Sequence, residues 1–290
     1  MDLKEIAKEI REIITLKQKE LSLTFIEDTH TYYMKDMKGN IVDNYPSVSK
    51  VLKCFYTEFP SHEKSLQKAK GCEIKQKEIL LEWQGTADYA TNMGSRVHYI
   101  LEQTLVEMYG KYKEVRQPIF DCDESQITKG DNMISAGKEF IDIMHERGAV
   151  LLDTEMVLGD IELGYTGQPD KMWLMLNKNN ELGICVSDYK SNKPKNFESH
   201  WYTVPMLEPF TEYPDTALSH YFIQLPLYVR LLLSMLKGSK YDDIKFFGGI
   251  VVLLKEDGNF VEYRIPKDIY TKIFEIDIKQ KINELCYYTK

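Results

Sequence analysis

The chain has 290 residues, of which 43% are hydrophobic and 28% are charged, as in ordinary folded proteins. Nothing in this composition indicates a disordered, fibrous or repeat architecture, and the length suffices for one large domain or two small ones. The formal net charge of −8 disfavours a protein that coats nucleic acid without specificity, but it permits a local basic channel.

The N-terminal sequence, the apolar stretches and the cysteines indicate the cellular compartment. The first residues, MDLKEIAKEIREII, are charged and helical in period, so we expect no signal peptide. The most apolar stretch, LPLYVRLLLSML, has Arg230 in its middle, and we expect no membrane association. The five cysteines are dispersed without a CxxC pair, which disfavours zinc ribbons and iron–sulfur clusters. We therefore expect reduced thiols in a cytoplasm, the host's if the protein is viral.

The N-terminal region is predicted to be mostly helical, with a small β-hairpin. A helix is expected over residues 2–20, and short strands and turns follow. Pro46 then opens another helix, with Ser47 or Ser49 as its N-cap. The start of this helix could hold a phosphate or could carry an ordinary cap. A lysine-rich helix is expected over 61–82, with either a solvated or a DNA-contacting face.

The next predicted helix, residues 86–109, carries polar groups on one stripe. Gly94, His98 and Glu102 recur every four residues, so they lie on one side of the helix. Gly94 permits close approach of another backbone, and His98 and Glu102 can point at the same site. The alternative is an ordinary core or surface histidine.

A polar loop is expected over 110–130, a helix over 131–147 and a strand over 149–158. Glu155 lies on this strand, where strand alternation directs it either to a metal or to solvent. These elements lead into the most informative stretch of the chain.

Residues 165–176 and 183–189 are predicted to form a β-hairpin around the polar turn NKNNEL. A simple antiparallel pairing puts Asp170 opposite Tyr189, and a one-step shift makes Asp170 a direct neighbour of Asp188. Asp188 and Lys190 share one face of their strand, while Tyr189 points away. Two carboxylates this close repel each other unless a cation lies between them, and oxygen ligands favour Mg²⁺ or Mn²⁺.

The segment 191–219 is a long loop that is expected to roof over the site. Lys193 and Lys195 make its start basic. Trp201 and Tyr202 could stack on unpaired bases or could hold the loop against the core.

The C-terminal part is predicted to contain a helix over 215–236, a hairpin of strands 245–254 and 259–265, and a last helix over 266–288. His220, Gln224 and Tyr228 lie on one stripe of the first of these helices. The chain has no GxxxxGK[ST] sequence, so we expect no nucleotide cofactor.

Several motifs together resemble a known superfamily. Pro169-Asp170 is followed eighteen positions later by Asp188-x-Lys190, with Gly94/His98 upstream and Gln224/Tyr228 downstream. This order resembles the RecB-like branch of the PD-(D/E)xK nucleases over about residues 85–235. The YPSVS segment after the HTYY strand is similar to standalone phage nucleases and mitochondrial genome-maintenance exonucleases. The lack of four clustered cysteines departs from the iron–sulfur members of the branch.

The resemblance implies an α/β fold with a mixed central sheet flanked by helices. Residues 1–84 would form the N-terminal helices and hairpin, and residues 85–290 the nuclease core. The implied reaction is metal-dependent hydrolysis of phosphodiester bonds, with Mg²⁺ or Mn²⁺ as the cofactor.

The resemblance also implies residue roles. His98, Asp170 and Asp188 would hold the metal, with the carbonyl of Tyr189 as a further ligand. Lys190 would orient the attacking water or neutralise developing charge. The residues implied to support the lysine or to position the DNA are Gln224, Tyr228 and Arg96.

The expected substrate is DNA cut from an end, with a preference for single-stranded or frayed ends. The roofing segment and its aromatic residues motivate this expectation, as does the resemblance. The alternatives are a duplex exonuclease or endonuclease of the same fold, an inactive nucleic-acid-binding protein, and a phosphodiesterase that acts on a nucleotide or small molecule. Polarity, DNA against RNA, and oligomeric state stay open.

Overall fold

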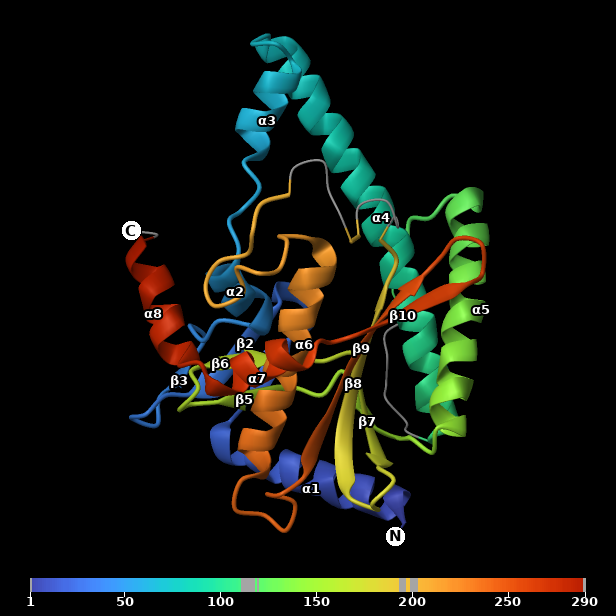
Figure 1. Ribbon diagram of the computed structural model, residues 1–290, viewed down its shortest axis with the longest axis vertical. Helices are drawn as coiled ribbons and strands as arrows, with labels where there is room; N and C mark the ends of the chain where they lie inside the picture. Colours follow the sequence, from blue (N-terminus) through green and yellow to red (C-terminus); the bar gives the residue numbers. More distant parts are fainter. Residues whose placement is uncertain (1, 111–117, 119, 193–196, 199–202, 289–290) are drawn as a thin grey trace.

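A five-stranded mixed β-sheet with helices on both faces forms the centre of the molecule (Figure 1). The computed structural model describes residues 2–110, 118, 120–192, 197–198 and 203–288, without the side chains of 285–288. The N-terminal part is largely helical. The predicted α/β class and flanking helices are therefore confirmed.

The N-terminal elements follow the sequence pattern. Helix α1 (Leu3–Leu21) begins after Asp2, whose carboxylate accepts a hydrogen bond from the Lys4 amide. A three-stranded sheet then forms from β1 (Thr24–Ile26), β2 (Thr31–Lys35) and β3 (Ile41–Val42). A 3₁₀ turn, Glu27–Thr29, joins the first two strands, and another, Lys53–Phe55, follows the short helix α2 (Val48–Leu52).

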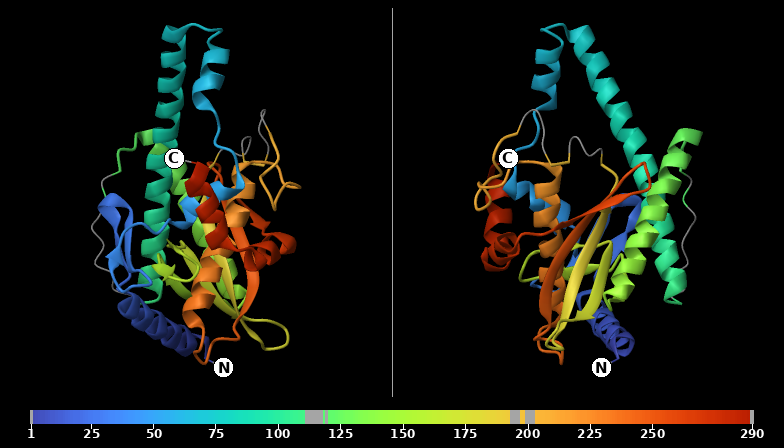
Figure 2. Two further views of the ribbon diagram at one scale, coloured as in Figure 1. Left: turned by 90° about the vertical axis from the view of Figure 1, so that its left-hand side faces the viewer. Right: turned by 45° about the vertical axis from the view of Figure 1, so that its right-hand side comes forward.

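A long helical hairpin projects from the body of the molecule (Figures 1 and 2). It consists of α3 (Ser61–Lys68) and the first part of α4 (Glu73–Met108). The predicted break between helices near residue 84 is wrong: α4 runs through Gly85, since one glycine costs a helix only about 1 kcal/mol. The turn comes earlier, at Lys70 and Gly71, which both have positive φ.

The division of the chain at residue 84 stays a prediction, and it falls inside α4. Apolar side chains from before that point, such as Ile10 and Phe55, pack in one cluster with Leu174 of the central sheet. The N-terminal elements therefore share a core with the rest of the chain.

Helix α5 (Glu124–Glu146) begins seven residues before its predicted start at 131. Asp123 accepts a hydrogen bond from the Gln126 amide, and the Gln126 side chain accepts one from the Asp123 amide. This reciprocal capping box supplies the start signal, and the D-x-x-Q spacing could have predicted it.

The central sheet has the strand order β10-β9-β8-β7-β4. Strands β8 and β9 run parallel, whereas the other neighbours are antiparallel. The strands are β4 (Val150–Thr154), β7 (Lys171–Leu176), β8 (Leu182–Lys190), β9 (Lys245–Leu254) and β10 (Phe260–Arg264).

Two predicted strands, 149–158 and 165–176, are each interrupted. The chain leaves the sheet at Glu155, whose φ of 49° is left-handed, and forms the separate pair β5 (Leu158–Asp160) and β6 (Tyr165–Gly167). It returns to the central sheet at Lys171. Asp170 therefore lies immediately before a strand instead of inside one.

The C-terminal helices pack beside the sheet. Helix α6 (Ala217–Leu236) follows the capping residue Thr216 and contains Pro226. The predicted single helix over 266–288 is wrong, because extended backbone at Ile276 separates α7 (Lys267–Glu275) from α8 (Ile278–Tyr288). No described helix is both long enough and apolar enough to span a bilayer.

Strand alternation divides the core between the two faces of the sheet. One face packs against α1 and α6, and the other against α4 and α5 (Figure 2). The first face carries Met172, Leu174, Ile184, Val186, Val251 and Leu253. The second carries Trp173, Cys185, Tyr189, Ile250, Val252 and Leu254. Asp188 and Lys190 continue the alternation of Ile184 and Val186 along β8, so their side chains point to the face that packs against α6.

Candidate metal centre

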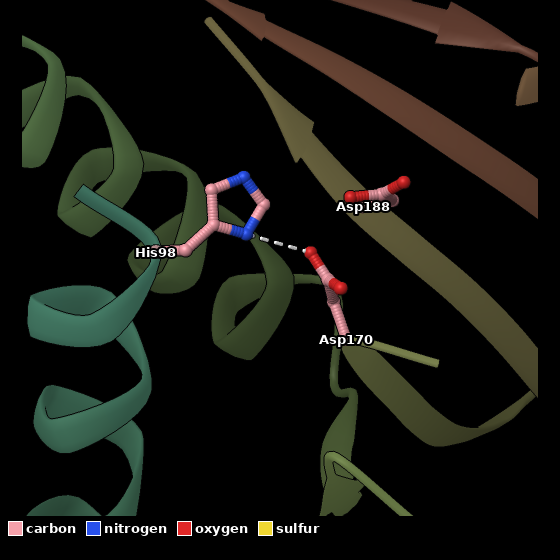
Figure 3. Close-up of side chains that lie close together, drawn as sticks. All are labelled: His98, Asp170 and Asp188. Atoms are coloured by element: carbon pink, nitrogen blue, oxygen red, sulfur yellow. Dashed lines mark ion pairs between the residues drawn. The ribbon is translucent and has the colours of Figure 1, made fainter. Parts of the chain in front are cut away.

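Three side chains from distant segments converge at one end of the sheet (Figure 3). His98 comes from α4, Asp170 from the residue before β7, and Asp188 from β8. One donor atom of each lies within 4.8 Å of the donor atoms of the other two. Lys171 pairs with Ser187, so the shifted register is the observed one and places the two aspartates side by side.

The donor atoms of this triad have the surroundings of a cation site. His98 Nδ1 lies 2.9 Å from Asp170 Oδ2, yet Asp170 Oδ2 makes no hydrogen bond within the described part of the chain. Asp188 Oδ1 is also buried and makes none there. Buried acceptors without donors are rare in folded proteins. Two carboxylates and an imidazole therefore fit a divalent ion that accepts oxygen and nitrogen ligands, such as Mg²⁺ or Mn²⁺.

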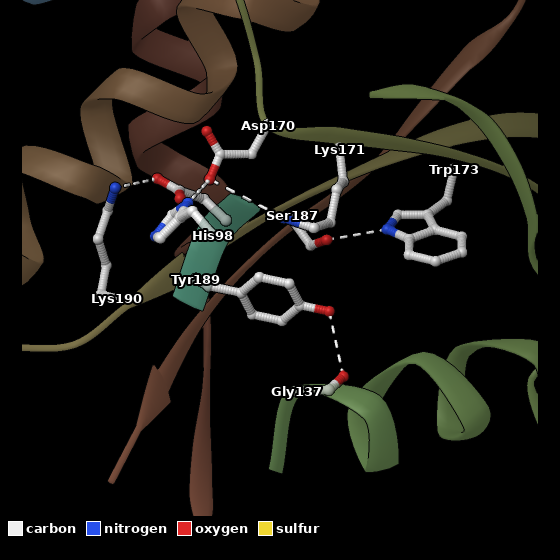
Figure 4. A network of polar contacts seen from close by, with 9 residues as sticks. His98, Gly137, Asp170, Lys171, Trp173, Ser187, Tyr189 and Lys190 are labelled. Carbon is white, nitrogen blue, oxygen red and sulfur yellow. Dashed lines mark hydrogen bonds and ion pairs between the residues drawn. The ribbon is translucent and has the colours of Figure 1, made fainter. Parts of the chain in front are cut away.

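Two lysines flank the carboxylates from opposite faces of the sheet (Figure 4). Lys190 Nζ lies 2.6 Å from Asp188 Oδ2. Lys171 Nζ lies 3.9 Å from Asp170 Oδ2 and 3.8 Å from the centre of the Tyr189 ring. The side chain of Lys171 is only 3% exposed. Lys171 is not among the site residues predicted from the sequence. Its position next to Asp170, and two residues before Trp173 on the same face of the strand, could have indicated it.

The pKa values of the two carboxyl groups are shifted in opposite directions. Burial raises the pKa of Asp188 to about 7, and the charge of Asp170 adds to the increase despite Lys190. Burial also acts on Asp170, but His98 and Lys171 outweigh it and hold the Asp170 pKa well below its usual range. Asp170 is therefore the more readily ionised of the two carboxyl groups, and Asp188 holds its proton to a higher pH than an ordinary aspartate.

Lys190 remains a charged ammonium despite its burial. Desolvation opposes the charge, but Asp188 and Asp170 outweigh it and raise the Lys190 pKa above its ordinary value. Burial lowers the pKa of Lys171, although Asp170 and Asp188 partly offset that effect.

An aromatic ring from α6 packs against Lys190. The Tyr221 ring centre lies 4.4 Å from Lys190 Nζ, and the Tyr221 hydroxyl donates to Asn192 Oδ1 at 3.3 Å. The resemblance assigned this support to Gln224 and Tyr228. Gln224 Nε2 donates to the Tyr228 hydroxyl at 3.0 Å, and Tyr228 lines the same cavity as Lys190. Tyr221 lies three residues before Gln224 on the same helix, and this spacing was the overlooked signal.

A cavity of about 1050 Å³ opens onto the metal centre. His98, Glu102 and Lys190 line it, as do Tyr228 and Glu155. The structure therefore brings both glutamates of uncertain role to the predicted site. Other walls come from the β1–β2 hairpin and from Tyr221 of α6.

Two glycines permit the close approaches at this site. A Cβ added to Gly94 would lie 2.9 Å from Ser191 Oγ, so the close neighbour at Gly94 is a side chain and not the expected backbone. A Cβ on Gly167 would lie 2.7 Å from Val48 Cγ2 and 2.8 Å from Tyr228 Cε1. The glycine at 167 thus lets the Tyr228 ring pack directly on the backbone.

Other predicted site residues have different surroundings. Arg96 Nη2 pairs with Asp131 Oδ1 of α5 at 2.7 Å, which joins α4 to α5. The Ser47 hydroxyl accepts a hydrogen bond from the Lys50 amide and caps α2. The Tyr189 side chain points away from the carboxylates, as predicted, and donates to the Gly137 carbonyl at 3.2 Å. The remaining residues lie outside the described part of the chain: Lys193, Lys195, Trp201 and Tyr202.

Comparison with known proteins adds no identity. No model of a known protein family matches the chain, and no curated protein is similar to it in sequence.

The raised pKa of Asp188 predicts a pH-dependent stability for the metal-free protein. The folded state binds this proton more tightly than the unfolded state, whose carboxyl titrates near 3.8. The stabilising contribution is therefore complete below about pH 4 and is lost as the pH rises through about 7. We expect the Tm in EDTA to fall across this range, and Asp188→Asn to remove most of the fall.

Thermal unfolding of both proteins at several pH values measures this difference. Asp121→Asn changes an exposed acid and serves as the control. If Asp188→Asn melted well below the unmutated protein in EDTA near pH 8, the assigned repulsion would be wrong.

Proposed function

We propose that this chain is a divalent-metal-dependent nuclease that hydrolyses phosphodiester bonds in DNA, related to the RecB-like branch of the PD-(D/E)xK nucleases. The observation that carries the proposal is the convergence of His98, Asp170 and Asp188, with two buried carboxylate oxygens that lack donors and with Lys190 beside them. The free thiols of Cys54, Cys72, Cys122 and Cys185 fit a reducing cytoplasm.

His98, Asp170 and Asp188 would hold the ion, and the carbonyl of Tyr189 is proposed as a further ligand. When bound, Mg²⁺ or Mn²⁺ supplies a Lewis acid that lowers the pKa of water and offsets charge on phosphate oxygens. Glu102 and Glu155 line the same cavity and can hold water or substrate by accepting hydrogen bonds.

Lys190 supplies fixed positive charge. Because its pKa is raised, it stays protonated at neutral pH and does not serve as a base. An ammonium has three donors, so Lys190 can bind Asp188 and still donate to a phosphate oxygen. The charged ammonium therefore suits both roles considered for this lysine, orienting the attacking water and neutralising charge on the phosphate.

An unpaired DNA end is the proposed substrate. The cavity is walled by α4, the β1–β2 hairpin and α6, so a strand reaches the metal centre between elements instead of across an open face. This arrangement favours a thin, flexible strand over a rigid duplex. It also supports cutting from an end over cutting within a closed duplex.

The first experiment measures hydrolysis of four matched substrates with Mg²⁺ and with EDTA. The substrates are a linear single strand, its closed circle, a blunt duplex and a dinucleotide. We expect cutting of the linear strand with Mg²⁺ only, and no cutting by Asp170→Asn, with Asp121→Asn as the matched control.

Each other outcome selects a rival. Equal cutting of the circle would show an endonuclease, and a preference for the blunt duplex would show a duplex exonuclease. Cutting of the dinucleotide alone would show a small-molecule phosphodiesterase. Binding without any cutting would show an inactive nucleic-acid-binding protein, and full activity in EDTA would reject the metal centre.

A second prediction separates Lys190 from the metal ligands. Lys190→Ala should reduce kcat by roughly 10²-fold or more, as expected when a positioned charge is removed. Mn²⁺ affinity should change little, because an ammonium is not a ligand. Lys129→Ala removes another paired lysine, which lies on α5 and does not line the cavity, and should leave both quantities unchanged. Near-normal turnover in Lys190→Ala would reduce Lys190 to a structural partner of Asp188.

A further inference from the structure

An aromatic cluster on the β1–β2 hairpin faces the same cavity as the metal centre. Phe25 and Tyr32 are direct partners in the β1–β2 register. Their ring centres lie 4.6 Å apart with an interplanar angle of 36°. His30 packs edge-on to Phe25 at 5.7 Å. All three line the cavity, together with His98 and Lys190.

The cluster presents one partly open ring on a fixed support. Tyr32 is buried, at 9% exposure, and its ring packs against the Phe25 ring and supports it. Thr24 and Ile26, the neighbours of Phe25 on the same strand, are exposed and point to the opposite side. Phe25 itself is half-buried. Phe25 is thus turned inward to the cavity, yet its ring is not fully covered by protein.

The charges of the cavity wall decide what this ring can bind. Among the described lining residues, Glu27, Glu102 and Glu155 carry carboxylates, and Lys190 carries an ammonium beside Asp188. Away from Lys190 and the metal ligands, the carboxylates repel a phosphate backbone, so this part of the wall attracts it little. The neutral face of a nucleobase avoids this repulsion, and stacking on an aromatic ring is tolerant of base identity.

We propose that Phe25, supported by Tyr32 and flanked by His30, is the stacking surface for an unpaired base of the DNA strand that reaches the metal centre. The proposal rests on the proposed nuclease function and names the contact that would select single strands. Inside a duplex each base face is already covered by its neighbours, so this ring favours an unpaired base over a paired one.

The test uses strand binding in the Lys190→Ala background, where hydrolysis is slow and Mg²⁺ can be present. Fluorescence anisotropy measures the Kd of a single-stranded oligonucleotide for three added changes: Phe25→Leu, Phe25→Trp and Ile26→Ala. Leucine keeps the apolar volume without a ring, and tryptophan keeps the ring. Ile26 is 45% exposed on the opposite face of the same strand and is the matched control.

We expect Phe25→Leu to weaken binding roughly 5- to 150-fold, the range for loss of one base stack. Phe25→Trp should stay within about twofold, and Ile26→Ala should have no effect. The salt dependence of binding should be unchanged in Phe25→Leu, because no charge is removed.

A scan of the oligonucleotide with single abasic sites identifies the stacked base without changing the protein. One position should show a loss similar to that of Phe25→Leu, and the two losses should not add. Additive losses would overturn the proposal, as would a scan in which no position matters. The scan also decides the question if Phe25→Leu lowers the Tm strongly.

The two proposals fail in different ways. If the unmutated chain bound single strands through Phe25 but cut no DNA with Mg²⁺, the nuclease function would fail and the stacking surface would stand. If the unmutated chain cut DNA and Phe25→Leu bound every strand normally, the stacking surface alone would be rejected.

Discussion

The repulsion between Asp170 and Asp188 is the constraint on which the site depends. The two carboxylates are neighbours in a largely buried position, where like charges cannot both ionise without a compensating cation. His98, Lys171 and Lys190 each lie close to one of them. The imbalance that remains is visible in the raised pKa of Asp188 and in two buried oxygens without donors. A divalent ion bound between the carboxylates would remove both features.

The opposite face of the sheet holds the strands that carry this charge. Trp173 Nε1 donates to Ser187 Oγ at 2.8 Å, and the Tyr189 hydroxyl donates to the Gly137 carbonyl on α5. These contacts anchor β7 and β8 within the apolar cluster under α4 and α5. Because side chains alternate, fixing one face also fixes the direction of Asp188 and Lys190 on the other. The same packing brings α4, and with it His98, to the end of β7 and β8 where the two aspartates lie.

Local patterns in the sequence were sufficient for the parts of the site that depend on strand geometry. Period-two alternation predicted the common face of Asp188 and Lys190, and the hairpin turn predicted a register within one residue of the observed one. Features set by tertiary contacts were missed. The left-handed Glu155 diverts the chain out of the sheet.

The missed site residues have the same physical origin. Lys171 is a charged residue at a core position next to Asp170 in the sequence, but the Tyr189 ring that it contacts becomes its neighbour only when β7 and β8 pair. Tyr221 reaches Lys190 across the boundary between α6 and β8. Phe25 lies far from the motifs along the chain and joins the cavity only through the fold. Periodicity describes a single element, whereas these contacts each join two.

Calorimetric titration with Mn²⁺ tests most directly whether the two carboxylates and His98 form a metal site. The raised pKa of Asp188 means that this carboxyl holds a proton below about pH 7. An ion bound there displaces that proton, so binding in this range should release close to one proton per ion. Titrations in buffers of different ionisation enthalpy count that proton. We predict one Mn²⁺ per chain with this release, and loss of both in Asp188→Asn. Equal binding by the unmutated chain and by Asp188→Asn would contradict the account.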